Sequence, residues 1–256
     1  MISAILLSKL AHDAGFDVEL GEREGWLQFR LPGRQLRAWL RAESANIVVA
    51  LSRNDVFAEL QFGTTWSGHL PRETQGARVV SSAADLVALL ARARVLDRTL
   101  PDALLAEFHA TPTVIERTEA EALVRQRRGQ ELFRKGLLEY WSGRCAITGI
   151  DVPELLRASH AKPWKDATDA ERLDVYNGLL LVAHLDAAYD KGLITVHPNG
   201  RVEVSRRLSP TALQVLGLDQ PACIPSLKGA HSPFLEWHIA HVFADRNQQG
   251  LTGGTD

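Results

Sequence analysis

The chain has few cysteines, no long apolar run and almost no net charge, and each absence excludes a class of protein. Two cysteines, 78 positions apart in 256 residues, form no disulfide framework and fit a reducing cytoplasm. No apolar run approaches the ~20 residues needed to cross a bilayer, and no basic region precedes the apolar N-terminus, so a signal peptide is not expected. A net charge of −2 means that any nucleic-acid-binding surface must be local.

Length and composition predict a soluble protein of one large or two ordinary domains, since 45% of the residues are hydrophobic and 23% charged. Apolar spacing predicts helices at 2–14 and 83–94, with strands at 16–20, 26–31, 36–40 and 47–51 between them. This is an α+β module of helices around a meander sheet. The sequence around Pro112 is the best domain boundary. We predict domains at 1–110 and 111–246 and a disordered tail at 247–256.

Two groups of residues in the first module have open interpretations. Trp26, Trp39 and Trp66 could stack on nucleic-acid bases, although packing within the sheet is the commoner role of tryptophan in strands. The second group comprises arginines around one turn, which could bind phosphates or be balanced by nearby glutamates; its members are Arg30, Arg34, Arg37 and Arg41.

A charged helix is expected from about 116 to 140, with Leu123, Leu132, Phe133, Leu137 and Tyr140 facing inward. Between positions 122 and 165 there are nine Lys or Arg against four Asp or Glu, so this segment is basic inside an acidic protein. Such a helix is usually a solvated face, but beside a site that acts on phosphate groups it would favour phosphate binding. The candidate contacts to nucleic-acid phosphates are Arg128, Arg134, Arg157, Lys162 and Lys165, although Arg157 could equally pair with Glu154.

The stretch from 157 to 195 holds the most informative residues. Asp186 and Asp190 are four apart on a predicted helix, so they share a face. Two close carboxylates repel each other unless a cation lies between them, and hard oxygen ligands suit Mg²⁺ or Mn²⁺. His160 is a candidate general base with an ordinary pKa near ~6.5. Together these residues indicate a metal-assisted hydrolase.

The order His160, Asn177, Asp186, Asp190 resembles the motif of the HNH endonuclease family. The string SHxxPW…RLDxxNGLLL…LDxxYDKGLIT is similar to a bacterial subgroup associated with restriction. The resemblance spans roughly 120–245 and implies a ββα-metal fold, in which two short antiparallel strands and a helix surround one metal ion. It implies that His160 is the general base, that Asn177 braces the loop orienting it, and that Asp186 and Asp190 hold the metal.

The sequence departs from the family pattern at two places. Many members have Asp or His, a further metal ligand, directly before the catalytic histidine, whereas this chain has Ser159. Many also have two Cys-x-x-Cys pairs for structural zinc, whereas here only Cys145 stands where the first pair would lie, so we expect a packed cysteine and no such zinc. We expect 145–149 and 155–160 to form the strand pair of the finger.

After the motif, the pattern predicts a hairpin of 192–196 with 201–205, a short helix at 209–216 and a final helix at 232–243. His238 and His241 have a spacing that can bind metal, but they more often belong to a packed or exposed face.

The sequence therefore predicts a metal-dependent DNA endonuclease, with the first domain selecting the DNA and possible homodimers cutting both strands. One alternative is a degenerate HNH-fold protein that binds nucleic acid without cleaving it, motivated by Ser159. A toxin-like effector whose first domain binds a protein is a further alternative.

Overall fold

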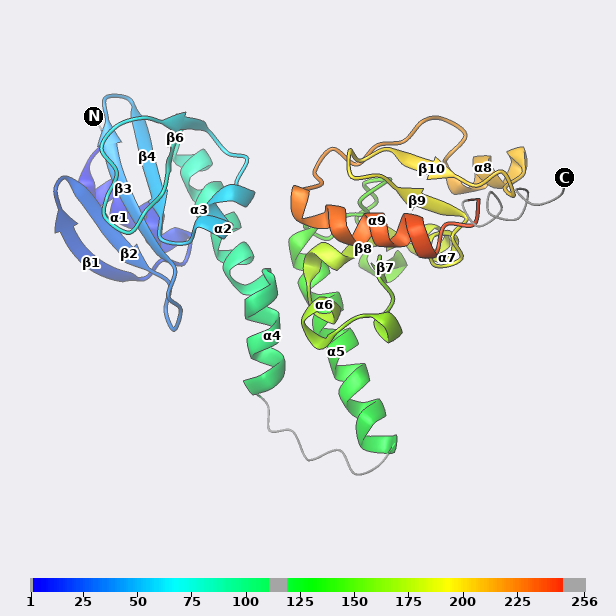
Figure 1. The fold of residues 1–256 in the computed structure, drawn as a ribbon. Coiled ribbons are helices and arrows are strands. Elements are labelled where there is room, and N and C mark those ends of the chain that lie inside the picture. The colour runs from blue at the N-terminus through cyan, green and yellow to red at the C-terminus, as the bar shows by residue number, and fades with distance from the viewer. Residues whose placement is uncertain (1, 111–118, 246–256) are drawn as a thin grey trace, which may run out of the picture. The chain divides into compact units, whose positions relative to one another are not determined.

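The computed structural model describes residues 2–110 and 119–245, and its contacts divide the chain into compact units at 1–98 and 99–256. Helices and strands are mixed throughout, as the predicted α+β class requires. The division falls before the expected boundary at 110–111, because helix α4 (Pro101–Ala110) packs against α5 (Glu119–Tyr140) and α6 (Asp169–Arg172) (Figure 1). The expected turn around Pro112 and the expected tail at 247–256 lie outside the described residues.

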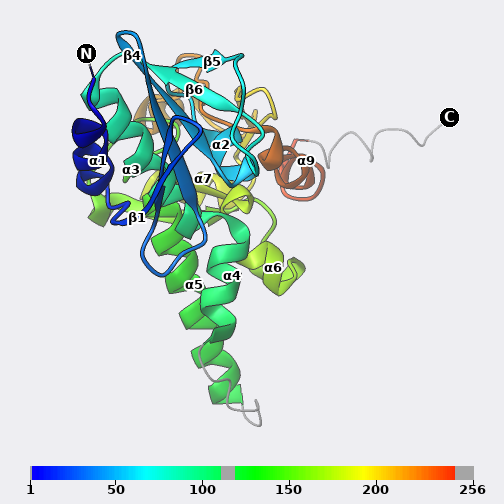
Figure 2. The ribbon, with the colours of Figure 1, turned by 90° about the vertical axis from the view of Figure 1, so that its left-hand side faces the viewer.

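The first unit is an antiparallel sheet in the order β1-β2-β3-β4-β6-β5, and its first four strands form the predicted meander. The strands are β1 (Val18–Arg23), β2 (Trp26–Arg30), β3 (Arg37–Glu43), β4 (Asn46–Leu51), β5 (Thr64–Trp66) and β6 (Ala77–Val80). Its helices are α1 (Ala4–Asp13), α2 (Asn54–Glu59) and α3 (Ala83–Thr99), of which α1 and α3 lie side by side on one face of the sheet (Figure 2).

Helix caps explain where the two predicted helices of this unit begin. The hydroxyl of Ser3 accepts a hydrogen bond from the amide of Leu6, and that of Ser82 accepts one from the amide of Asp85. Helix α3 runs past its predicted end at residue 94, because Leu96 is buried and Asp97 bonds to Arg53.

The other face of the sheet has its own apolar cluster, which contains Trp26 and Trp39, with Trp66 packed against it. Trp26 and Trp39 are only 2% and 3% exposed, so these two side chains pack within the unit. The arginines of the turn have acidic neighbours: Arg37 pairs with Glu73, and Arg34 lies 4.0 Å from Asp97.

The second unit begins with α4 and α5, which lie side by side and antiparallel (Figure 1). Its other helices are α6, α7 (Ala183–Asp190), α8 (Pro210–Leu216) and α9 (Ser232–His241), and its strands are β7 (Leu156–His160), β8 (Gly178–Val182), β9 (Ile194–Val196) and β10 (Val202–Val204). The predicted hairpin is confirmed, since β9 pairs with β10. Phe133 and Leu137 of α5 are buried as predicted, but Leu123 is 48% exposed, so its inward assignment was wrong.

The strand pair of the finger differs from the prediction. Strand β7 pairs with β8, from Leu156 opposite Val182 to His160 opposite Gly178, and not with residues 145–149. The latter form a turn that ends at Gly149, whose φ of 73° favours glycine. All five residues of β8 are buried, as expected for a strand covered on both faces.

No helix in the described part of the chain is both long and apolar enough to cross a membrane.

Candidate active site

A strand hairpin and one helix position the predicted site residues. Strand β7 ends at His160, β8 leads directly into α7, and α7 packs against both strands. Asp186 and Asp190 therefore lie on a helix that covers the hairpin. His160, Asp186 and Asp190 line one pocket of about 650 Å³, together with Lys165, Lys191 and His241.

One ring nitrogen of His160 is hydrogen-bonded to a backbone carbonyl. Its ring stacks on Phe133 with centroids 3.8 Å apart and meets Trp164 edge-on at 5.8 Å. Nε2 lies 2.9 Å from the carbonyl oxygen of Arg172. A carbonyl can only accept a hydrogen bond, so Nε2 carries the proton and Nδ1 retains its lone pair. Burial lowers the pKa of His160 to about 4, so the imidazole is neutral at neutral pH.

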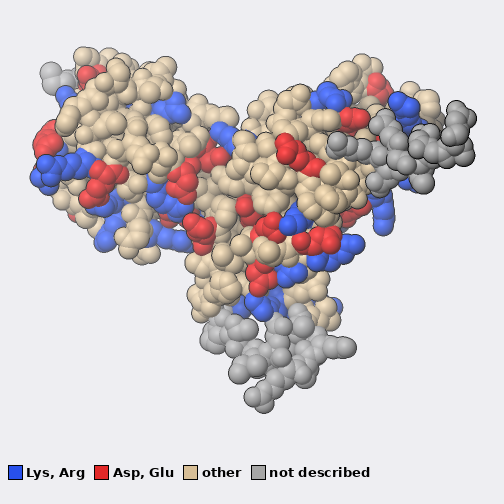
Figure 3. Space-filling view, viewed as in Figure 1, with Lys and Arg blue, Asp and Glu red and all other residues tan. Residues whose placement is uncertain are grey.

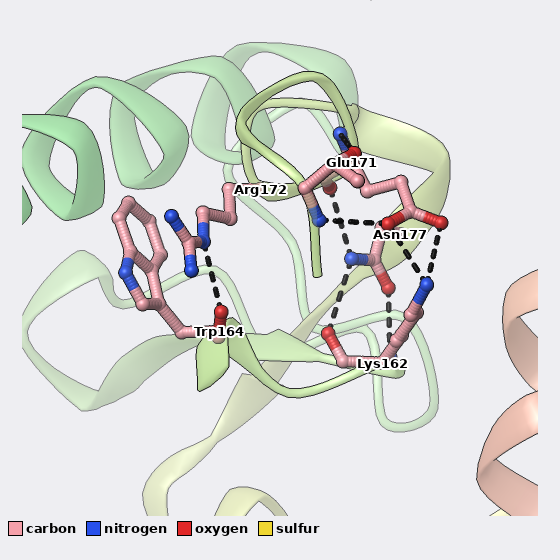
Figure 4. Close-up of polar contacts among 6 residues, drawn as sticks. Lys162, Trp164, Glu171, Arg172 and Asn177 are labelled. Carbon is pink, nitrogen blue, oxygen red and sulfur yellow. Dashed lines mark hydrogen bonds and ion pairs between the residues drawn. The ribbon is translucent and has the colours of Figure 1, made fainter. Parts of the chain in front are cut away.

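Asn177 connects the two ends of the loop between residues 162 and 171 (Figure 4). Its side chain is fully buried, with Oδ1 accepting from the amide of Lys162 at 2.7 Å. Its Nδ2 donates to the carbonyls of Lys162 and Glu171 at 3.1 and 2.9 Å. The ammonium of Lys162 also binds both carboxylate oxygens of Glu171, at 2.7 and 2.8 Å. Since Arg172 follows directly, this network fixes the carbonyl that binds His160.

The carboxylates of α7 interact with each other and with β7. Burial and the charge of Asp186 raise the pKa of Asp190, while Lys191 acts in the opposite direction. The buried hydroxyl of Ser159 donates a hydrogen bond to Oδ1 of Asp186 at 2.5 Å. The two carboxylates repel each other, and together with the neighbouring hydroxyl they form a set of oxygen donors of the kind that Mg²⁺ and Mn²⁺ bind. By their chemistry these oxygen donors suit a hard divalent cation, but the described residues contain no group of three His, Cys, Asp or Glu that could hold one.

Four of the five cations considered for DNA contact are bonded to protein acceptors. Arg128 donates to the carbonyl of Phe108 at 3.0 Å, near the end of α4, and Arg134 donates to that of Leu156 at 2.7 Å. Arg157 donates to the carbonyls of Glu154 and Leu156, both at 2.9 Å, and not to the carboxylate of Glu154. The fourth is Lys162, described above. Lys165 is exposed at the pocket. On the face drawn in Figure 3, acidic and basic side chains are interspersed.

The two histidines of α9 have different surroundings. His238 is buried, with Nδ1 2.9 Å from the hydroxyl of Thr195 and Nε2 3.1 Å from the carbonyl of Tyr189, so both nitrogens are engaged. His241 is exposed and stacks on Trp237 at the pocket. The pair therefore does not form a joint metal site. Cys145 is buried, as a packed cysteine would be.

Sequence reasoning missed three contributors to the site: the carbonyl of Arg172, which binds His160, and Lys191 and Trp237, which line the pocket. Lys191 could have been found, because it directly follows Asp190. The Arg172 contribution is a backbone carbonyl, which no residue type reveals. The contact of α9 depends on long-range packing.

The comparison with known families agrees with this geometry. Residues 145–197 match the family model described as HNH endonuclease, and that stretch contains His160, Asn177, Asp186 and Asp190. No curated protein matches the chain. The match supports nuclease activity, for which DNA is the implied substrate. Over residues 145–197, therefore, this chain is similar to an HNH endonuclease domain.

Proposed function

We propose that the protein is a metal-dependent DNA endonuclease that hydrolyses phosphodiester bonds in the pocket lined by His160, Asp186 and Asp190. One observation carries this proposal. The neutral imidazole of His160, whose Nε2 is hydrogen-bonded to a backbone carbonyl, lines the same pocket as the carboxylates of Asp186 and Asp190.

In this reaction His160 is the general base. Nδ1 takes a proton from the attacking water, and the positive charge that forms on the ring is partly offset by the hydrogen bond from Nε2 to the Arg172 carbonyl. Asn177 is a positioning residue, since it holds the loop that carries this carbonyl.

Asp186 and Asp190 would hold one Mg²⁺ or Mn²⁺. When bound, such an ion stabilises negative charge developing on the phosphate and on the leaving oxygen. Its charge would also relieve the repulsion between the two carboxylates, which is present in the protein alone. Lys165 and Lys191 add positive charge at the pocket for the phosphates of the strand.

We propose further that the first unit selects the DNA, in the manner of restriction systems, including DNA with modified bases. This role of the first unit is inferred from the resemblance to restriction-associated proteins. Because a single-metal HNH unit cuts one strand, cleavage of both strands would require a homodimer.

The test is plasmid cleavage by wild type and His160→Ala with Mg²⁺, Mn²⁺, Ni²⁺ or EDTA. The substrates are unmodified DNA and DNA containing methylated or hydroxymethylated cytosine. His184→Ala is the matched control, because His184 is exposed on α7 of the same domain. We expect metal-dependent nicking or linearisation that His184→Ala retains and His160→Ala loses by at least about a hundredfold.

Two results would contradict the proposal. Cleavage that persists in His160→Ala would mean that another group is the base. DNA binding without cleavage of any substrate would favour a degenerate binding protein, an alternative motivated by Ser159 and by the two-carboxylate site.

A further inference from the structure

A second pocket borders the same Pro163–Lys165 segment as the catalytic pocket. Its volume is about 620 Å³, and it shares Pro163, Trp164 and Lys165 with the catalytic pocket. The side chains that matter here are two aromatic rings, three cations and one carboxylate: Phe108, Trp164, Arg125, Arg172, Lys165 and Asp169.

Two arginines in this pocket each lie over an aromatic ring. The guanidinium carbon of Arg125 is 5.2 Å from the ring centroid of Phe108, and that of Arg172 is 5.1 Å from the ring centroid of Trp164. Figure 4 shows the second pair, in which Nε of Arg172 also donates to the carbonyl of Trp164 at 2.8 Å.

One carboxylate joins the two arginines. Oδ2 of Asp169 lies 3.0 Å from Nη2 of Arg125, and Oδ1 lies 2.8 Å from Nη1 of Arg172. The arginine side chains remain 35% and 26% exposed, respectively. Both guanidinium groups are therefore held in place while part of each is open to solvent.

This arrangement suits a ligand that has both a flat ring and negative charge. Unpaired nucleobases stack on aromatic rings and on guanidinium planes, and phosphates bind to arginine and lysine. Three cations face one carboxylate here, so positive charge is in excess. A base paired within a duplex has no free face, whereas an unpaired base does.

Part of the pocket lies outside the matched domain. Phe108 is on α4 and Arg125 on α5, both before residue 145. The pocket is therefore built by the HNH domain together with the helices that precede it in the same unit.

We propose that this pocket binds an unpaired nucleotide of the substrate DNA strand, next to the phosphate that is cleaved. The base stacks on the guanidinium planes of Arg125 and Arg172, and Lys165 contacts the adjacent phosphate. This inference rests on the proposed function for the identity of the substrate, but it concerns binding and not cleavage.

The experiment compares two single-stranded probes of equal length and charge, oligothymidine and an oligomer of abasic sites, by fluorescence anisotropy in EDTA. We expect the full-length protein to bind oligothymidine about tenfold or more tightly than the abasic strand. Arg125→Lys should reduce this ratio severalfold while retaining affinity for the abasic strand, because lysine keeps the charge but lacks one of the two stacking planes. Arg127→Lys is the control, since Arg127 is exposed on the same helix and is not among the residues lining either pocket in the described chain.

Equal affinity for the two probes, or equal effects of Arg125→Lys and Arg127→Lys on their ratio, would overturn the proposal. Since no metal is present, the outcome is independent of cleavage. A protein that cleaves plasmids but fails this test retains its proposed function without this subsite, and one that passes without cleaving any plasmid is a nucleic-acid-binding protein.

Discussion

The hydroxyl of Ser159 donates a hydrogen bond to Oδ1 of Asp186, with the two oxygens 2.5 Å apart. A serine thus contacts the carboxylate pair from the sequence position that many HNH proteins use for a further metal ligand. Neutral serine contributes less to the binding of a divalent cation than a carboxylate does, because affinity for such ions rises with ligand charge.

Replacing Ser159 with Asp should therefore increase metal affinity. We expect Ser159→Asp to reduce the Mn²⁺ concentration for half-maximal cleavage by about tenfold, because a third carboxylate joins the pair. In EDTA the same variant should unfold at lower temperature, since its added charge is buried near two others. Ser159→Ala removes only the hydrogen bond and is the control. An unchanged or higher Mn²⁺ requirement in Ser159→Asp would contradict the assignment of the metal site.

Asn177→Ala should destabilise the protein and also slow DNA cleavage. The substitution leaves one amide and two carbonyls at the ends of the loop without their partner. Each lost partner costs about 1–3 kcal/mol, so we expect a decrease of about 3 kcal/mol in the free energy of unfolding after relaxation. Urea unfolding measures this change. Asn199→Ala is the control, because Asn199 is an exposed turn residue that accepts one hydrogen bond. Similar losses in the two variants would argue against a bracing role.

The sequence predicted the candidate site well because the residues with suitable chemistry lie close together in one short stretch. His160, Asn177, Asp186 and Asp190 lie within about thirty residues, and fixed spacing on one strand and one helix brings three of them to one pocket. Their roles in the reaction stay predictions.

Other features depend on contacts that residue types do not encode. The β7 partner was misassigned because residues 145–149 and β8 both contain apolar residues, and only burial on two faces distinguishes β8. The elements α2, β5 and β6 have six, three and four residues, too few for a periodic pattern. The basic character of α5 suggested phosphate binding, yet Arg134 donates to the carbonyls of Pro153 and of Leu156, the first residue of β7.

Three histidines with lowered pKa values should make the free energy of unfolding decrease in acid. Burial lowers the pKa of His160, His231 and His238 to about 4 each, against about 6.5 in an unfolded chain. The unfolded state thus binds more protons below pH 6.5, and stability is lost as the pH falls from there toward 4. Asp174 opposes this trend, because burial raises its pKa to about 6. Urea midpoints between pH 7 and 5 should therefore decrease, and His231→Gln should reduce the slope. A midpoint that is constant over this range would contradict the prediction.

Asp186→Asn should separate charge repulsion from metal binding. Asparagine keeps an oxygen that accepts from Ser159 but removes the charge that raises the pKa of Asp190. We expect unchanged or higher thermal stability in EDTA. The stabilisation of wild type by Mn²⁺, about 2.7 kcal/mol at a hundredfold excess over Kd, should disappear. Asp219→Asn, on an exposed residue, should retain the Mn²⁺ effect. Retention by Asp186→Asn would place the ion elsewhere.

Lys162 and Lys165 are three residues apart in one loop, and their surroundings predict opposite consequences of removal. The ammonium of Lys162 is bound to Glu171 and is 19% exposed, so Lys162→Ala should cost about 1 kcal/mol of stability. Lys165 is exposed at both pockets, so Lys165→Ala should leave stability unchanged and weaken DNA binding. Loss of one phosphate contact reduces the slope of log Kd against log salt by about one. Thermal unfolding and salt titrations of DNA affinity in EDTA measure the two effects. If Lys162→Ala alone changed the salt slope, Lys162 would be the DNA contact, and its half-buried ion pair with Glu171 would have to open for DNA to bind.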